Sequence, residues 1–219
     1  TLHARQNRGD EVEAILQKGL AANPDSTALH LILARYYAGS RKPQKAITQV
    51  EEIIALEPEN IAHKLTLARL YHENGQSRAA EETLDGLIQA DPTDEETRLQ
   101  VARFWLQTGN SGKCETILLD GLTLDPASYD CRLLLAELYA NTNRTEQAAG
   151  ILQEALAIDN DPASPDNLRT KIALAQVHLK LQNPDAAEEL VDEVLAESPK
   201  NVEAQMTKGR LRLMAGDGL

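Results

Sequence analysis

The sequence is poor in aromatic residues, in cysteine and in positive charge. Only 3% of its 219 residues are aromatic although 42% are hydrophobic, so the core has to be built mainly from Leu, Ala, Ile and Val. That composition favours helices over strands. The net charge of -12 argues against a general nucleic-acid binder, because phosphate binding depends on Lys and Arg. We therefore expect no nucleic-acid partner.

Long hydrophobic runs are also missing. No stretch approaches the roughly 18 apolar residues that can span a bilayer, so the sequence predicts no direct insertion into a membrane. No signal peptide is evident. Because the chain starts at Thr1 rather than Met and ends in the short run 216–219, we expect a soluble piece of a longer protein.

Motifs that carry catalytic or metal chemistry are not found. The five histidines include no pair three or four residues apart, and there is no Cys-x-x-Cys, phosphate-binding loop or nucleophile elbow. His178 is interpreted as a packed side chain. Cys114 and Cys131 are interpreted as partly buried thiols, although a disulfide between them stays open. We predict no enzyme, no cofactor and no metal site.

A period of 34 residues organises the chain. Pro24, Pro58, Pro92 and Pro126 follow one another at that interval, and the next proline in the series, Pro199, comes after an insertion near 159–165. Each unit contains two helical patterns, here named A and B, with a polar or glycine turn between them. Repeated helix pairs predict an all-α solenoid in which each unit packs on its neighbours. The predicted single domain 1–219 comprises a half repeat 10–26, repeats 27–60, 61–94, 95–128, 129–162 and 168–201, and a half repeat 202–215.

The repeated residues resemble the tetratricopeptide repeat. Leu33-Ala34, Tyr37 and Ala46 recur 34 residues later as Leu67-Ala68, Tyr71 and Ala80, and similar residues continue through the later units. The family's early tryptophan is replaced, for example by His30 in the first whole unit. The resemblance implies a right-handed superhelical solenoid of antiparallel helix pairs, with A helices lining a concave groove and B helices forming the back. It also favours a bacterial protein, whose compartment, cytoplasm or periplasm, stays open.

One face of the A helices is the predicted ligand site. Places two, five, nine and twelve of each unit share a helical face, and the resemblance makes it the groove face. Arg35, Arg69 and Arg103 form a column on it, beside a ladder of apolar residues. Arginine grips carboxylates at two points, which favours an acidic and apolar ligand. In the alternative, Arg69 pairs with Glu96 and Arg103 with Asp130. The candidate groove residues are Leu31, Arg35, Leu65, Arg69, His72, Leu99, Arg103, Leu106, Gln176 and Arg210.

Three local predictions concern the helices themselves. Thr93 and Glu96 have the spacing of a capping box. Gly112 and Gly121 lie inside the B helix of the third whole unit and predict that it is the least protected B helix, since each interior glycine costs about 1 kcal/mol. Acid pairs such as Glu51 with Glu52 recur on the B helices, which carry most of the protein's acidity, and are interpreted as solvated outer faces.

These features favour a non-catalytic scaffold that binds a peptide or protein segment in the groove. Binding of a chaperone tail is disfavoured, because Leu31 and Arg35 stand where the family's tail-binding members have Lys and Asn. In a second hypothesis, a structural or oligomerisation module makes its contacts through the ends of the solenoid, including self-association through the apolar half repeat 202–215. In a third, the chain is a regulatory domain of a larger enzyme. The insertion at 159–165 is either a longer loop or a hinge.

Overall fold

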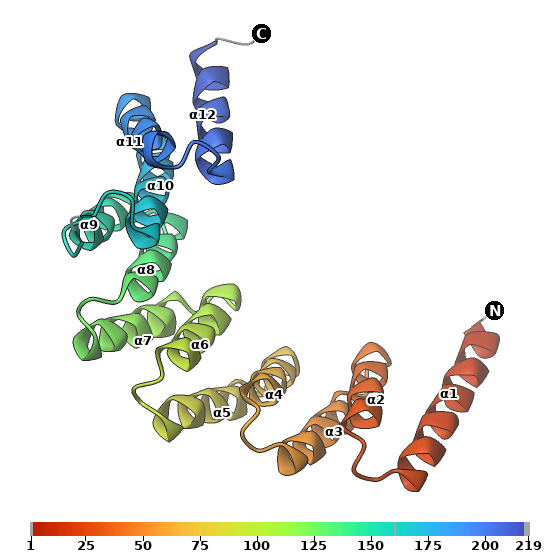
Figure 1. The fold of residues 1–219 in the computed structure, drawn as a ribbon. Coiled ribbons are helices and arrows are strands. Elements are labelled where there is room, and N and C mark those ends of the chain that lie inside the picture. Colours follow the sequence, from red (N-terminus) through yellow and green to blue (C-terminus); the bar gives the residue numbers. More distant parts are fainter. Residues whose placement is uncertain (1, 160, 217–219) are drawn as a thin grey trace. The chain divides into compact units, whose positions relative to one another are not determined.

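The protein is described by a computed structural model that covers residues 2–159 and 161–216, with side chains from residue 9 onward except residue 10. Residue 160 of the insertion and the chain ends, residues 1 and 217–219, lie outside the described residues. Every regular element in the described part is an α-helix (Figure 1). The helices of the described residues are α1 (Leu2–Ala22), α2 (Thr27–Gly39), α3 (Pro43–Leu56), α4 (Ile61–Glu73), α5 (Ser77–Ala90), α6 (Glu95–Gln107), α7 (Ser111–Leu124), α8 (Tyr129–Asn141), α9 (Thr145–Leu156), α10 (Pro165–Lys180), α11 (Pro184–Glu197) and α12 (Val202–Ala215).

The chain forms two compact units, and the boundary between them falls within α6. Unit 1 runs to Thr97 and unit 2 begins at Arg98. In unit 1, α2 packs on α3 and α4 packs on α5; in unit 2, α8 packs on α9 and α10 on α11. Short turns join the helices of each pair, so each pair is a helical hairpin. The described chain is therefore an all-α array of A and B helices, with the even-numbered helices as A and the odd-numbered ones as B.

Each A helix leads into its B helix through the same tight turn. The backbone of the turn residue is left-handed, with φ of 74° at Gly75, 80° at Gly109 and 60° at Asn143. The next amide donates to the carbonyl five residues before it, as from Gln76 to Tyr71 at 2.8 Å. This is the Schellman arrangement, which satisfies carbonyls at a helix end. The five A-to-B turn residues are Arg41, Gly75, Gly109, Asn143 and Gln182.

The repeated small and apolar residues form the core. Ala46 and Ala80 are fully buried in unit 1, as are Ala148 and Ala187 in unit 2. Cys114 takes the same place in α7 and is also fully buried. A small side chain at this place lets the two helices of a pair approach closely, so neighbouring large residues such as Leu and Val fill the remaining space.

The start of α10 differs from the predicted boundary. The sequence predicts that the fifth whole repeat begins at Leu168, but α10 begins at Pro165 and has 16 residues where α8 has 13. The Ser164 hydroxyl accepts a hydrogen bond from the Asn167 amide at 3.2 Å, and Pro165 takes the first helical position, where a missing N–H costs nothing. Part of the insertion is therefore helix rather than loop.

The predicted capping box at the start of α6 is wrong. Asp94, not Thr93, caps the helix, since its Oδ1 accepts from the amides of Glu96 at 3.0 Å and Thr97 at 3.3 Å. Thr93 instead donates to Asp91 through both its amide and its hydroxyl. An aspartate cap places negative charge beside the amide end of the helix dipole, which is the favourable arrangement.

Gly121 has a packing role that the sequence does not predict. Gly121 is buried in α7, and a Cβ built on it would lie 2.7 Å from the Arg98 Cδ and 2.9 Å from the Cys131 Sγ. A helical glycine at this place therefore lets α7 come close to the side chains of α6 and α8. Gly112, by contrast, is exposed, with nothing within 4 Å of the added Cβ. The two glycines of α7 are thus not equivalent.

Candidate functional site

The predicted groove face is only partly available to a ligand. Arg35, Arg69, Arg103 and Arg210 are exposed, whereas Leu99 is only 6% exposed and belongs to the core. Leu99 therefore offers little surface to a ligand. The half-buried members of the predicted set are Leu31, Leu65, His72, Leu106 and Gln176.

The arginines on this face do not form ion pairs with neighbouring acids of the described residues. Among the described side chains, Arg35, Arg69 and Arg103 have no ion pair within 4.0 Å. Asp130, the acid that the alternative pairs with Arg103, is bonded to another residue. The guanidinium nitrogens of these three arginines are therefore accessible to a ligand carboxylate.

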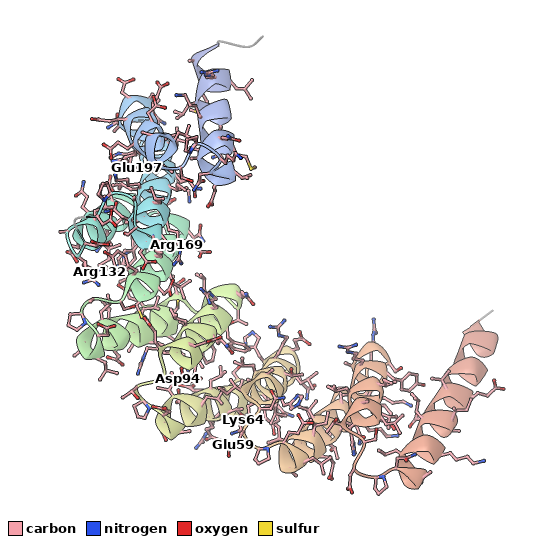
Figure 2. The ribbon with its side chains drawn as sticks, viewed as in Figure 1. Glu59, Lys64, Asp94, Arg132, Arg169 and Glu197 are labelled. Carbon is pink, nitrogen blue, oxygen red and sulfur yellow. The ribbon has the colours of Figure 1, made fainter. Side chains whose placement is uncertain are left out.

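Asp130 pairs instead with Arg169 of α10, which is labelled in Figure 2. Its Nη2 lies 2.6 Å from the Asp130 Oδ1, and its Nη1 lies 3.1 Å from the Asp166 Oδ1. The pairing with Asp130 is the first cause of the raised pKa of Arg169. Arg169 and Asp130 thus neutralise each other between α8 and α10, so Asp130 is not available to Arg103.

Two adjoining cavities open on the A helices of unit 2. One has a volume of about 570 Å³ and is lined by Arg103 and Leu106 of α6. The other, of about 370 Å³, is lined by Gln176 of α10. Glu137 and Asn141 of α8 line both cavities. We name this surface the α6–α8–α10 groove, and its residues used below are Arg103, Leu106, Leu133, Glu137, Asn141, Gln176 and Lys180.

The structure brings three of the predicted residues to this groove. Arg103, Leu106 and Gln176 line it, while Leu31, Arg35, Leu65, Arg69 and His72 belong to unit 1 and line none of the described cavities. Arg210 lies on α12 and is exposed outside the described cavities. Glu137 stands at place nine of the predicted groove face but is not among the candidate residues, and Asn141 lies next to that face. A sign change from arginine to glutamate at place nine of the unit is the signal that could have found Glu137.

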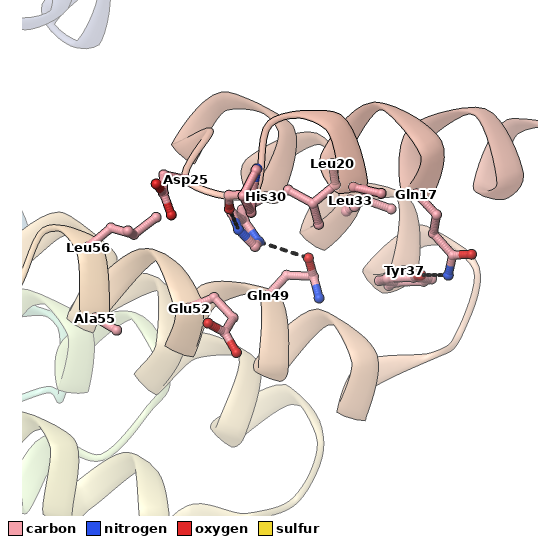
Figure 3. Close-up of a pocket in the computed structure, with 12 residues that line it drawn as sticks. Gln17, Leu20, Asp25, His30, Leu33, Tyr37, Gln49, Glu52, Ala55 and Leu56 are labelled. Carbon is pink, nitrogen blue, oxygen red and sulfur yellow. Dashed lines mark hydrogen bonds between the residues drawn. The ribbon is translucent and has the colours of Figure 1, made fainter.

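A third cavity lies in unit 1, between α1, α2 and α3 (Figure 3). Its volume is about 570 Å³. The buried His30 ring lies 2.9 Å from the Gln49 Oε1 and 2.9 Å from the Pro24 carbonyl oxygen, and Gln17 donates to the Tyr37 hydroxyl at 3.1 Å. Because His30 stands where the family has the larger tryptophan, we interpret this cavity as space left by that replacement. These polar groups are already bonded within the unit.

Acidic residues of the B helices join neighbouring repeats. Glu115 of α7 accepts two hydrogen bonds from Arg144 and one from the Tyr139 hydroxyl at 2.9 Å. In unit 1, Glu13 accepts from Lys42 and Lys45. Glu51 is exposed, as the interpretation of B-helix acids as solvated outer faces predicts, and it also accepts a hydrogen bond from the Tyr71 hydroxyl at 2.8 Å. The acids that act in this way are Glu13, Glu51 and Glu115.

These hydrogen bonds perturb the acidities of the groups that form them. The ammonium groups of Lys42 and then Lys45 lower the pKa of Glu13 to about 2. The guanidinium of Arg144 lowers the pKa of Glu115. Burial and then the Glu51 carboxylate raise the pKa of Tyr71 to about 12. These perturbed groups therefore lie at seams between repeats rather than in the groove, which indicates a structural role.

Chemistry of other kinds has little support in the described residues. No group of three or more His, Cys, Asp or Glu side chains in that part is placed to hold a metal ion. The buried thiols of Cys114 and Cys131 are not joined by a disulfide. None of the described helices combines the length and the apolar character needed to cross a bilayer.

The model of the tetratricopeptide repeat family matches residues 37–97, 118–164 and 163–211, which is more than half of the chain. The chain belongs to the tetratricopeptide repeat family. Its fold is accordingly a helical repeat solenoid, and the general role that this family supports is that of a protein-interaction scaffold. None of the curated proteins matches the chain.

Solved structures of the tetratricopeptide repeat family have a similar fold. TTC0263 of Thermus thermophilus is 18% identical, with a TM-score of 0.55 over 86% of this chain and 100% of that chain. A repeat protein of Parabacteroides merdae is also 18% identical, with a TM-score of 0.56 over 97% and 82%. YrrB, described as having an unusual peptide-binding site, is 12% identical, with a TM-score of 0.51 over 89% and 97%. At these identities the likeness concerns the fold alone.

Proposed function

We propose that this tetratricopeptide repeat protein is a non-catalytic scaffold that binds an extended peptide or protein segment in the α6–α8–α10 groove. The observation that carries the proposal is the pair of adjoining cavities, which share Glu137 and Asn141. Together they form a continuous lining across three successive A helices, and a chain segment can follow it. Polypeptide is the preferred ligand class, since a chain of net charge -12 repels nucleic acid.

The lining suits a polypeptide chemically. Leu106 and Leu133 supply apolar contact, and the carboxamides of Asn141 and Gln176 supply both donors and acceptors. Arg103 contributes a guanidinium without an ion pair among the described side chains, which suits a ligand carboxylate. In unit 1, Arg35 and Arg69 are exposed in the same way. We propose a ligand that combines apolar and acidic residues.

Site-specific photocrosslinking tests the proposal. A benzophenone amino acid placed at Gln176, in the groove, is expected to crosslink to a polypeptide when the chain is expressed in a bacterial host. The matched control is the same amino acid at Gln153, which is exposed on the B helix α9. Equal crosslinking from the two positions would count against the groove.

The exposed apolar face of α12 favours a second candidate, contact through the end of the solenoid. Val202 is 68% exposed, Met206 70%, Leu213 73% and Met214 61%. Apolar side chains gathered on one helix are a frequent sign of a contact surface. Light scattering of the chain over a range of concentrations, with Met206→Glu as the variant, tests this. A monomer at every concentration would reject self-association through α12.

A further inference from the structure

The ninth place of the repeat changes sign in unit 2. The first three whole repeats have Arg35, Arg69 and Arg103 there, and the fourth has Glu137. Glu137 is exposed and lines both cavities of the α6–α8–α10 groove. A carboxylate therefore stands in the middle of a surface that the arginine column predicts to be basic.

Within the described residues, the carboxylate of Glu137 is not neutralised by an ion pair. Among the described side chains it has neither an ion pair nor a hydrogen bond through its carboxylate. The nearby acid on the same helix, Asp130, differs in this respect because Arg169 binds it at 2.6 Å. The Glu137 carboxylate also acts on a buried group. Burial, and then this carboxylate, raise the pKa of Cys114 to about 11. An unpaired carboxylate beside two cavities can accept hydrogen bonds from a cationic group of a ligand.

Positive groups flank Glu137 on both sides. Arg103 of α6 lines the cavity that Glu137 shares with that helix, and Lys180 of α10 lines the other. Lys180 donates one hydrogen bond, to the Ala140 carbonyl oxygen at 3.1 Å, and its ammonium group has three N–H donors in all. From α6 through α8 to α10, the groove therefore presents the positive Arg103, the negative Glu137 and the positive Lys180.

We propose that Glu137 selects a basic side chain at the centre of the bound segment, with acidic side chains on either side facing Arg103 and Lys180. Neighbouring packed helices lie about 8–10 Å apart, and an extended chain advances about 3.3 Å per residue. The complementary segment therefore has its acidic residues about three positions before and after the basic one. This inference rests on the proposed function, since it names the ligand class of the same groove.

Synthetic peptides test the charge order directly. The main probe is a fluorescein-labelled heptapeptide with Asp at its first and seventh positions, Lys at the fourth, Leu at the second and sixth, and Ser elsewhere. A second peptide has norleucine in place of Lys, which keeps the alkyl chain and removes the charge. Binding to the full chain is measured by fluorescence anisotropy at 50 mM and at 500 mM NaCl.

The expected result is a preference for the Lys peptide over the norleucine peptide of about fivefold at 50 mM NaCl, as for a partly exposed ion pair. The preference should shrink at 500 mM NaCl, because salt screens it. Glu137→Gln should abolish the preference, and Glu137→Lys should reverse it in favour of a peptide with Asp at the centre. Glu154→Gln, on the exposed face of α9, is the matched control and should leave the preference unchanged.

The failures of the two proposals are distinguishable. If both peptides bind the wild-type chain equally and Glu137→Gln changes neither, the charge selection is wrong while groove binding stands. If neither peptide binds at 50 mM NaCl, the charge-order inference fails, and the groove proposal is decided separately by crosslinking from Gln176 compared with Gln153. Thermal melting of each variant, followed by circular dichroism, shows whether a loss of binding reflects loss of the fold.

Discussion

Glu115 of α7 and Arg144, at the start of α9, are joined by two hydrogen bonds of 2.6 and 2.7 Å. The Arg144 guanidinium carbon also lies 4.0 Å from the centre of the Tyr139 ring, and the Tyr139 hydroxyl donates to the same carboxylate. One acid thus holds a cation and an aromatic residue of the next repeat. A two-point pair of this kind fixes orientation better than a single contact does, so it sets how α7 meets α8 and α9.

Glu13 of α1 stands at the place in unit 1 that corresponds to Glu115 in unit 2. Its pairing with lysines predicts that the protein loses stability in acid. Its pKa is lowered from 4.5 to about 2 in the folded chain by Lys42 and then Lys45. A carboxyl group with a lowered folded pKa stabilises the protein above its unfolded pKa and loses that contribution as the pH falls. The stabilising contribution of Glu13 should therefore disappear between about pH 4.5 and about pH 2.

Urea unfolding at a series of pH values measures this effect. The midpoint of Glu13→Gln should fall less steeply below pH 4.5 than that of the wild-type chain. Glu11→Gln is a suitable control, because Glu11 is exposed two residues earlier on α1. Identical pH profiles for the wild-type chain and Glu13→Gln would show that the seam does not depend on this carboxylate.

The thiols should be protected from reagents in the native chain. Cys114 is fully buried and its pKa is raised from 9.0 to about 11 by burial, Glu137 and Glu115. Only the thiolate attacks a disulfide reagent, so at pH 8 the reactive fraction is about a hundredfold smaller than in an ordinary thiol. Dithionitrobenzoate should label the single-cysteine variant Cys131→Ala far more slowly in buffer than in 8 M urea. Rapid labelling of the native variant would mean that α7 opens readily.

The two glycines of α7 should respond in opposite directions to substitution by alanine. Gly121→Ala would crowd Arg98 and Cys131, and overpacking of this kind costs about 1–3 kcal/mol. Gly112→Ala meets nothing within 4 Å and should stabilise the helix by up to about 1 kcal/mol. Chemical denaturation measures both values. If both substitutions stabilise the chain, the simpler prediction holds that the two glycines only weaken α7. Hydrogen exchange along the B helices would show where the protection changes.

The repeat period predicts the helices better than it predicts the groove. Leu33-Ala34 and their counterparts mark the A helices because every repeat must bury the same face. The predicted repeat start at Leu168 lies inside α10, which begins at Pro165, because a serine before a proline is a good helix start. The repeat pattern assigns Leu99 to the groove from its place in the unit, yet that side chain is buried. Periodicity fixes a helix face but not the depth of each side chain on it.

The seam residues could not be found from residue type alone. Glu51 and Glu115 stand on B helices among many other acids, and most of those other acids are exposed. What distinguishes the two is a tyrosine in the following A helix, which reaches each carboxylate. Such a relation joins residues 20 or more positions apart, so it follows from the packing of one repeat on the next. Tyr139 followed by Arg144 is the local part of this signal.

The A-to-B turns offer a last test, at Gln182. This residue has φ of 57°, a left-handed conformation that Gly75 adopts in another repeat with φ of 74°. For a residue with a Cβ this conformation costs about 1–2 kcal/mol, a cost that glycine avoids. Glycine in turn costs about 0.5–1 kcal/mol, because it has greater freedom in the unfolded chain. Gln182→Gly should therefore stabilise the chain by about 0.5–1 kcal/mol, measured by urea unfolding. Gly75→Ala, with open space around the new Cβ, should be destabilising by about 1 kcal/mol. If Gln182→Gly destabilises the chain, the Gln182 side chain contributes more to the turn than its backbone strain costs.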